Sequence, residues 1–176
     1  MNQKVVLALV VIAIAAAGIY FYGSRKAGVS APDLAPVGAT LLEGLGDYSM
    51  PVSSDHPDVQ RWFDQGLALT YGFNHDAAER SYLKAAELDP DCAMCWWGAA
   101  LVLGPHVNAA MDPANNAKAW DRLQRARDAA EDTNEKERDW IEALAARYAE
   151  APPENRRPLD EAYAAAMAEL AVKYPD

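Results

Sequence analysis

The sequence predicts an all-α protein made of a single N-terminal transmembrane helix followed by an α-solenoid of about three helix pairs. Three observations support this fold class. Residues 59–92 place large and small side chains at the intervals that two packed antiparallel helices require, Trp96 follows Trp62 after 34 residues, and residues 5–23 carry no charge. A helix pair cannot bury its apolar face alone, so such units stack around a continuous core.

The composition divides the chain into three parts. A charge-free stretch comes first, a segment rich in proline, glycine and serine follows, and the remainder has helical periodicity. We expect three repeats in the last part. The predicted boundaries are 1–26 for a transmembrane signal anchor, 27–58 for a tether that packs on the first repeat, and 59–92, 93–132 and 133–176 for the repeats of a helical domain at 59–176.

The N-terminal apolar run is long enough to cross a membrane. Residues 5–23 are uncharged, and a bilayer core needs about 20 helical residues. Tyr20 and Tyr22 lie near the end of the run, where aromatic rings favour the membrane interface. A cleaved secretory signal is the alternative, because the alanines at 15–17 offer a cleavage site. We favour an uncleaved anchor, because the apolar run continues beyond that site.

The charges that flank this run do not fix its orientation, because Lys4 on one side is nearly balanced by Arg25 and Lys26 on the other. A short N-terminal tail and a large acidic domain suit a domain outside the cytoplasm. We therefore expect a single-pass protein of the inner membrane of a Gram-negative bacterium, with its C-terminal domain in the periplasm.

The charge of the chain restricts its partners. The formal net charge is −10, and the three basic residues of positions 1–26 leave 13 basic against 26 acidic residues, or −13, for the remainder. Phosphate backbones and anionic headgroups repel such a domain. We expect protein partners that are neutral or basic, and no nucleic acid.

Large, small, aromatic and proline residues occupy fixed positions in the first repeat and at the start of the second. They are Trp62, Gly66, Ala78, Tyr82, Ala85, Pro90 and Trp96. This pattern resembles that of tetratricopeptide repeats, with departures at Gln65 and Leu69. The resemblance implies that Trp62 wedges between the paired helices, and that Gly66 and Ala78 let the two backbones approach closely. It also implies that Tyr82 fills the gap toward the next repeat. Pro90 ends the second helix, because it lacks an amide hydrogen.

A longer stretch, QRWFDQGLALTYGFNHDAAERSYLKAAELDPDCAMCWWGAALVLGP, resembles the opening of a group of bacterial tetratricopeptide proteins. They share a GFNH turn and a DP-x-CAM-x-WWG junction, and the resemblance covers residues 41–176. It implies an interaction scaffold. It does not indicate a particular biochemical activity, because the group has no agreed activity and one fold can serve many functions. Together with the anchor, it favours an accessory subunit of a membrane-associated complex. The expected protein partners of such a subunit include an integral membrane complex.

The turn between the first two helices has a structural explanation. Gly72 is able to take a positive φ, and Asn74 is able to cap the second helix. We interpret the neighbouring His75 as a structural residue, because a lone histidine in such a turn is more often a surface or capping residue than a ligand.

Cys92 and Cys95 form the one reactive-looking motif, and several interpretations of it stay open. A structural role, as packed cysteines or as a disulfide, ranks first. Metal binding ranks second, and a redox dithiol at a helix N-terminus ranks third. Covalent haem attachment is excluded, because Trp96 stands where that motif needs histidine. The soft ligands suited to Cu(I) are Cys92, Met94, Cys95, His106 and Met111.

The segment 104–117 departs most from the repeat pattern, and loops on rigid scaffolds often carry function. Trp96 and Trp97 are adjacent and cannot face the same way, so we expect one of them to line a groove or to meet a partner. The final helix has an apolar stripe and is a further candidate contact surface. The predicted protein-binding residues are Trp97, His106, Asn108 and Met111.

No catalytic motif stands out. The sequence contains no GxSxG, no HExxH and no phosphate-binding glycine loop. We therefore expect a protein that is not an enzyme and that holds no cofactor. The predicted function is a membrane-anchored scaffold that binds protein partners, and the alternative is a periplasmic copper-type or dithiol redox module centred on residues 92–95.

Overall fold

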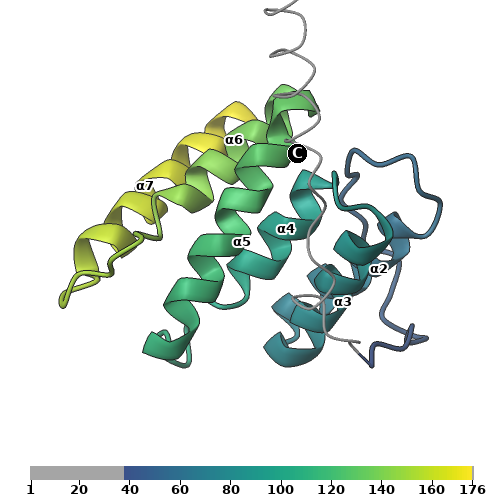
Figure 1. The fold of residues 1–176 in the computed structure, drawn as a ribbon, viewed down its shortest axis with the longest axis horizontal. Helices are drawn as coiled ribbons and strands as arrows, with labels where there is room; N and C mark the ends of the chain where they lie inside the picture. The colour runs from purple at the N-terminus through teal and green to yellow at the C-terminus, as the bar shows by residue number, and fades with distance from the viewer. Residues whose placement is uncertain (1–37, 176) are drawn as a thin grey trace, which may run out of the picture. The chain divides into compact units, whose positions relative to one another are not determined.

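The computed structural model describes residues 38–175, and this part of the chain is all-helical, with no strand (Figure 1). The predicted all-α class is confirmed for these residues. The helices are α2 (Val59–Tyr71), α3 (His75–Leu88), α4 (Ala93–Leu101), η2 (Pro113–Asn115), α5 (Asn116–Ala129), η3 (Ala130–Asp132), α6 (Glu135–Ala145) and α7 (Arg157–Lys173).

The predicted anchor at 1–26, with its apolar run at 5–23, lies outside the described residues, as does the start of the predicted tether. Among the helices that the structure describes, none combines the length and the apolar character that crossing a bilayer requires.

Helices that follow one another in the chain pack together. The pairs are α2 with α3, α4 with α5, and α6 with α7, and they succeed one another across the molecule (Figure 1). Between pairs, α3 contacts α4 and α5 contacts α6, while α4 also contacts α6. The helix α4 is therefore central, and all but one of its nine residues are buried.

The aromatic ring of Tyr82 joins the first pair to the second. This side chain is fully buried, and a Cβ atom built on Gly66 of α2 or Gly98 of α4 would come within 2.7 and 2.4 Å of the ring. The ring therefore fills the space that two missing side chains leave. Its hydroxyl lies 3.1 Å from Thr70 Oγ1, whose own hydrogen goes to the Gly66 carbonyl.

The remaining repeat positions lie at helix contacts or ends. Trp62, Ala78, Ala85 and Trp96 are buried. Pro90 is exposed and follows the last residue of α3, and its carbonyl accepts a hydrogen bond of 2.9 Å from Trp96 Nε1. The proline carbonyl thus helps to fix the start of the second pair.

The turn after α2 differs from the predicted one. Gly72 has a φ of −79°, which is close to the helical value and not the positive φ that was expected. Phe73 has the positive φ instead, at 57°. The amides of Phe73 and Asn74 donate to the carbonyls of Thr70 and Leu69, which is the pattern of a helix end closed by a left-handed residue. A residue of this bulk is a rare occupant of that position, and the Asn74 side chain makes no capping hydrogen bond.

The last helix buries few of its side chains and makes several polar contacts with α6. Leu170 is the one buried residue of α7. Lys173 Nζ lies 2.6 Å from carboxylate oxygens of both Glu135 and Asp139 on α6, and the Tyr174 hydroxyl donates to Asp139. These hydrogen bonds, that of Lys173 first, lower the pKa of the Asp139 carboxyl. Val172 stays 84% exposed.

Candidate functional site

The two cysteines at the start of α4 are bonded to each other. Cys92 and Cys95 form a disulfide with a Cα–Cα distance of 5.4 Å, and both are fully buried. Cys92 is also the N-terminal capping residue of α4, since its sulfur accepts the Cys95 amide at 3.2 Å. The disulfide agrees with the structural role that ranked first for these two cysteines. A disulfide sulfur is not the thiolate that binds metal.

Two members of the predicted soft ligand set, His106 and Met111, do not lie at the cysteines. Cys92 precedes α4 and His106 follows it, so the two lie at opposite ends of that helix. Met94 is fully buried, and the Met111 sulfur accepts a hydrogen bond of 3.2 Å from Arg156 Nη1. Within the described part of the chain, no three or more His, Cys, Asp or Glu side chains form a cluster that could hold a metal ion.

We expect the Cys92→Ala, Cys95→Ala variant to lose about 2 kcal/mol of unfolding free energy, because a disulfide that closes a short loop restricts the unfolded chain only modestly. Urea unfolding of this variant and of the oxidised protein measures the difference. Adding a reductant should lower the stability of the parent protein and leave the variant unchanged. A reduced parent that keeps its full stability and takes up stoichiometric copper would instead support the metal alternative.

Trp97, a predicted partner-binding residue, lies in the core. Its side chain is 2% exposed, its ring packs edge-on against Trp140 at 5.6 Å, and its Nε1 donates to the Trp140 carbonyl at 3.1 Å. Trp96 is buried as well, with Arg125 above its ring. The expectation that one of the adjacent tryptophans lines a groove is therefore wrong in this structure, because α4 is covered on every side.

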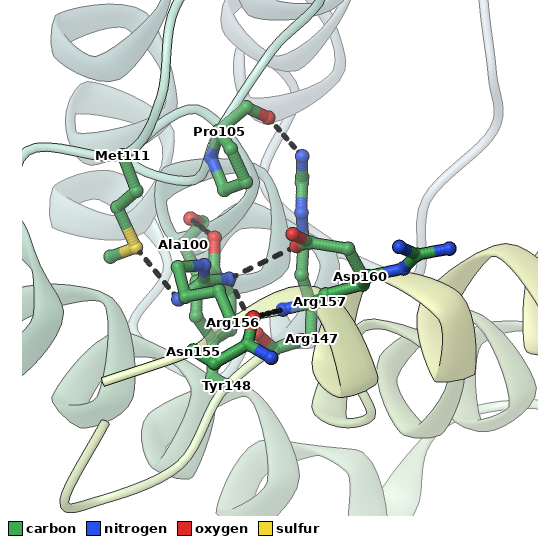
Figure 2. A network of polar contacts seen from close by, with 9 residues as sticks. All are labelled: Ala100, Pro105, Met111, Arg147, Tyr148, Asn155, Arg156, Arg157 and Asp160. Atoms are coloured by element: carbon green, nitrogen blue, oxygen red, sulfur yellow. Dashed lines mark hydrogen bonds and ion pairs between the residues drawn. The ribbon is translucent and has the colours of Figure 1, made fainter. Parts of the chain in front are cut away.

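The base of the 104–117 loop is fixed by side chains from the segment that joins α6 to α7 (Figure 2). The Tyr148 hydroxyl donates to the Ala100 carbonyl at 2.7 Å, and burial raises the pKa of this phenol. The Arg147 guanidinium donates to the Pro105 carbonyl. Met111 is buried under Arg156, so this predicted partner-binding residue instead anchors the loop.

Arg156 ties this network together. Its Nη2 donates to the Arg147 carbonyl at 2.8 Å, while Asn116, the first residue of α5, donates to the Ala149 carbonyl at 3.1 Å. Both ends of the loop are thus bonded to the segment that joins α6 to α7. A loop held in this way presents its tip in a fixed position.

The tip of the loop is a tight turn with Val107 and Asn108 at its apex. The amide and carbonyl of His106 exchange hydrogen bonds of 3.0 and 3.1 Å with those of Ala109, and the Asn108 amide donates to His106 Nδ1. Val107 is 84% exposed. A solvent-exposed branched apolar side chain is therefore held out on a rigid turn.

The loop tip meets the turn between α2 and α3. The rings of His75 and His106 lie 4.3 Å apart, and that of Phe73 stacks on His75 at 6.4 Å. His75 Nδ1 lies 3.4 Å from the Val102 carbonyl, and Phe73 is 58% exposed. We name Phe73, His75, His106 and Val107 the turn–loop surface.

His106 and Asn108 lie in the 104–117 loop, as the sequence predicts. The sequence did not single out Phe73 or Val107. A valine between His106 and Asn108, at the centre of a predicted loop, was a usable signal, because loop tips are normally polar. The positive φ of Phe73 has no such signal, since Gly72 beside it was the better candidate for that conformation.

Comparison with protein-family models, with functionally characterised proteins and with solved structures finds no match to this chain.

Proposed function

We propose that this chain is a tetratricopeptide-like scaffold that binds a protein partner through the turn–loop surface. The observation that carries the proposal is the placement of Val107, an exposed apolar side chain on a loop whose base is bonded on both sides. Pre-organised apolar side chains bind well because little conformational freedom is lost on association.

Phe73 supports the same surface. An exposed aromatic ring at a positive φ costs about 1–2 kcal/mol relative to the ordinary conformation, and it buries little in return. Strained residues tend to lie where function requires them. Phe73 stacks on His75, and His75 contacts the ring of His106, so the three rings offer the aromatic contact area in which interfaces are enriched.

The partner is expected to be a neutral or basic protein surface, because residues 27–176 carry a formal charge of −13, from 13 basic and 26 acidic residues. The apolar run at 5–23 would anchor the scaffold in an inner membrane with the helical domain in the periplasm. In that setting the chain serves as an accessory subunit of a membrane complex.

The metal or dithiol alternative needs the Cys92–Cys95 disulfide to be reduced and the first turn of α4 to open, since both sulfurs are buried. No observation on the described residues favours it over the scaffold, and we develop it no further.

Val107→Asp is expected to lower the amount of partner recovered with the full-length protein from native membranes at least tenfold. A carboxylate at the centre of an apolar contact would have to be desolvated on binding, which costs free energy. Stability should change by less than about 0.5 kcal/mol, because the site is exposed.

Val172→Asp is the matched control, because Val172 is the same residue type with the same 84% exposure on another surface. It should leave the partner in place. Loss of the partner in Val172→Asp together with its retention in Val107→Asp would move the contact to α7 and refute the turn–loop surface.

A further inference from the structure

The segment that precedes α2 is held to that helix by two glutamines. Gln60 Nε2 donates to the Met50 carbonyl at 2.9 Å, and Gln60 Oε1 accepts from the Val52 amide at 3.0 Å. Gln65 repeats this arrangement with the Thr40 carbonyl at 3.0 Å and the Leu42 amide at 2.7 Å. Each carboxamide thus bonds the carbonyl of one residue and the amide of the next but one.

This spacing is that of extended backbone. In a strand, the carbonyl of residue i and the amide of residue i+2 point to the same side, so one carboxamide can replace a neighbouring strand at that point. Both glutamines are themselves oriented, since Gln60 donates to Asp64 and Gln65 donates to Ser81 of α3. The helix α2 therefore carries two glutamine carboxamides that are already oriented to bind an extended main chain.

A third pair of contacts lies at the end of the segment. Glu137 Oε1 on α6 accepts the Ser53 amide at 2.6 Å, and Asp89, which follows α3, accepts the Ser54 hydroxyl at 2.5 Å. We name residues 40–54 the strap. It is bonded to the first and the third helix pair, and nearly all of these bonds are made by its backbone and its serines.

Several large side chains of the strap contribute little to its attachment, whereas Leu41, Met50 and Val52 are half-buried. Leu42, Leu45 and Tyr48 are exposed, and Gly44 and Gly46 take positive φ values of 81° and 86° where the chain turns between the two glutamine contacts. An open hollow of about 240 Å³ lies between this turn and α2. The strap is thus held by polar contacts that water or another backbone can replace.

We propose that the glutamine face of α2 is a second binding site, specific for the extended main chain of a partner polypeptide, and that the strap occupies it in cis as a competitor. The occupant seen in the structure defines the chemistry of the ligand: an extended segment with free amides two residues after each bonded carbonyl. This inference does not depend on the turn–loop surface, which lies around residues 73–75 and 106–107.

The test uses a fluorescent synthetic peptide with the sequence of residues 38–54, added to the full-length chain. In the Val52→Pro chain the strap loses the amide that Gln60 accepts, while α2 itself is unchanged. We expect this variant to bind the peptide at least tenfold more tightly than the parent chain does. Adding Gln60→Ala to the same chain should abolish the gain.

Two control peptides test the main-chain character of recognition. A peptide with prolines at the positions of Leu42 and Val52 should fail to bind, and a peptide with serines there should bind as the parent peptide does. Val107→Asp should leave peptide binding unchanged, which separates this site from the turn–loop surface.

The parent chain provides a second measurement that needs no variant. Excess peptide should speed hydrogen exchange at the Leu42 and Val52 amides, because it displaces the strap. Equal peptide affinity of the parent and Val52→Pro chains, binding of the proline peptide, or unchanged exchange at saturating peptide would each overturn the proposal.

Discussion

Gly98→Ala is expected to lower the free energy of unfolding by at least about 2 kcal/mol. An added methyl group in a closely packed core typically costs about 1–3 kcal/mol, and here the new Cβ would stand 2.4 Å from the Tyr82 ring. The ring has no room to move away, because a Cβ atom built on Gly66 of α2 would also come within 2.7 Å of it. Glycine to alanine inside a helix normally stabilises by about 1 kcal/mol, so the sign of the effect is itself diagnostic. Urea unfolding followed by circular dichroism gives the measurement.

Two variants test the cause. Gly38→Ala should have almost no effect, because nothing lies within 4 Å of the atom it adds. In a double-mutant cycle, Tyr82→Leu should remove most of the penalty of Gly98→Ala, since the clash is with the aromatic ring. Strict additivity of the two changes would show that the ring is not the obstacle.

Trp97→Ala should cost about 4 kcal/mol of unfolding free energy, near the middle of the range for removing a large buried aromatic side chain. The variant loses the edge-on contact with Trp140 and the hydrogen bond to its carbonyl, and both link α4 to α6. Trp97→Phe keeps an aromatic ring and removes the donor, so it should lose clearly less. Thermal and urea unfolding of the two variants measure these differences.

The same variants decide between the two roles considered for Trp97. A contact residue would lose the partner while keeping its stability, whereas a core residue loses stability first. Tyr71→Ala serves as the control for an exposed aromatic side chain and should change stability by less than about 0.5 kcal/mol. A stable Trp97→Ala protein that no longer binds its partner would contradict the buried position.

The helical class could be predicted from the spacing of side chains along single helices, and the close packing around Tyr82 was implied by the resemblance to tetratricopeptide repeats. Gly66 lies sixteen residues before Tyr82, and Gly98 sixteen residues after it, so the small and large partners of this contact are visible in the sequence. The all-α class follows from the same periodicity and is confirmed for residues 38–175.

What could not be predicted depends on contacts between distant segments. The burial of both tryptophans follows from how α6 and the other helices cover α4, and no local pattern encodes that. The sequence led us to expect that the segment before α2 packs on the first repeat. It did not show that two glutamines on α2 would bond the backbone of that segment. The choice of Phe73 over Gly72 for the left-handed position likewise depends on tertiary surroundings.

Because α7 buries few side chains against the other helices, it is expected to unfold locally before the rest of the protein. With a single buried residue and charged groups that remain in water, this helix contributes little to the cooperative core, and elements of this kind detach at a free energy below that of global unfolding. The last pair can therefore open from its far end while Tyr82, held between α2 and α4, keeps the first two pairs joined.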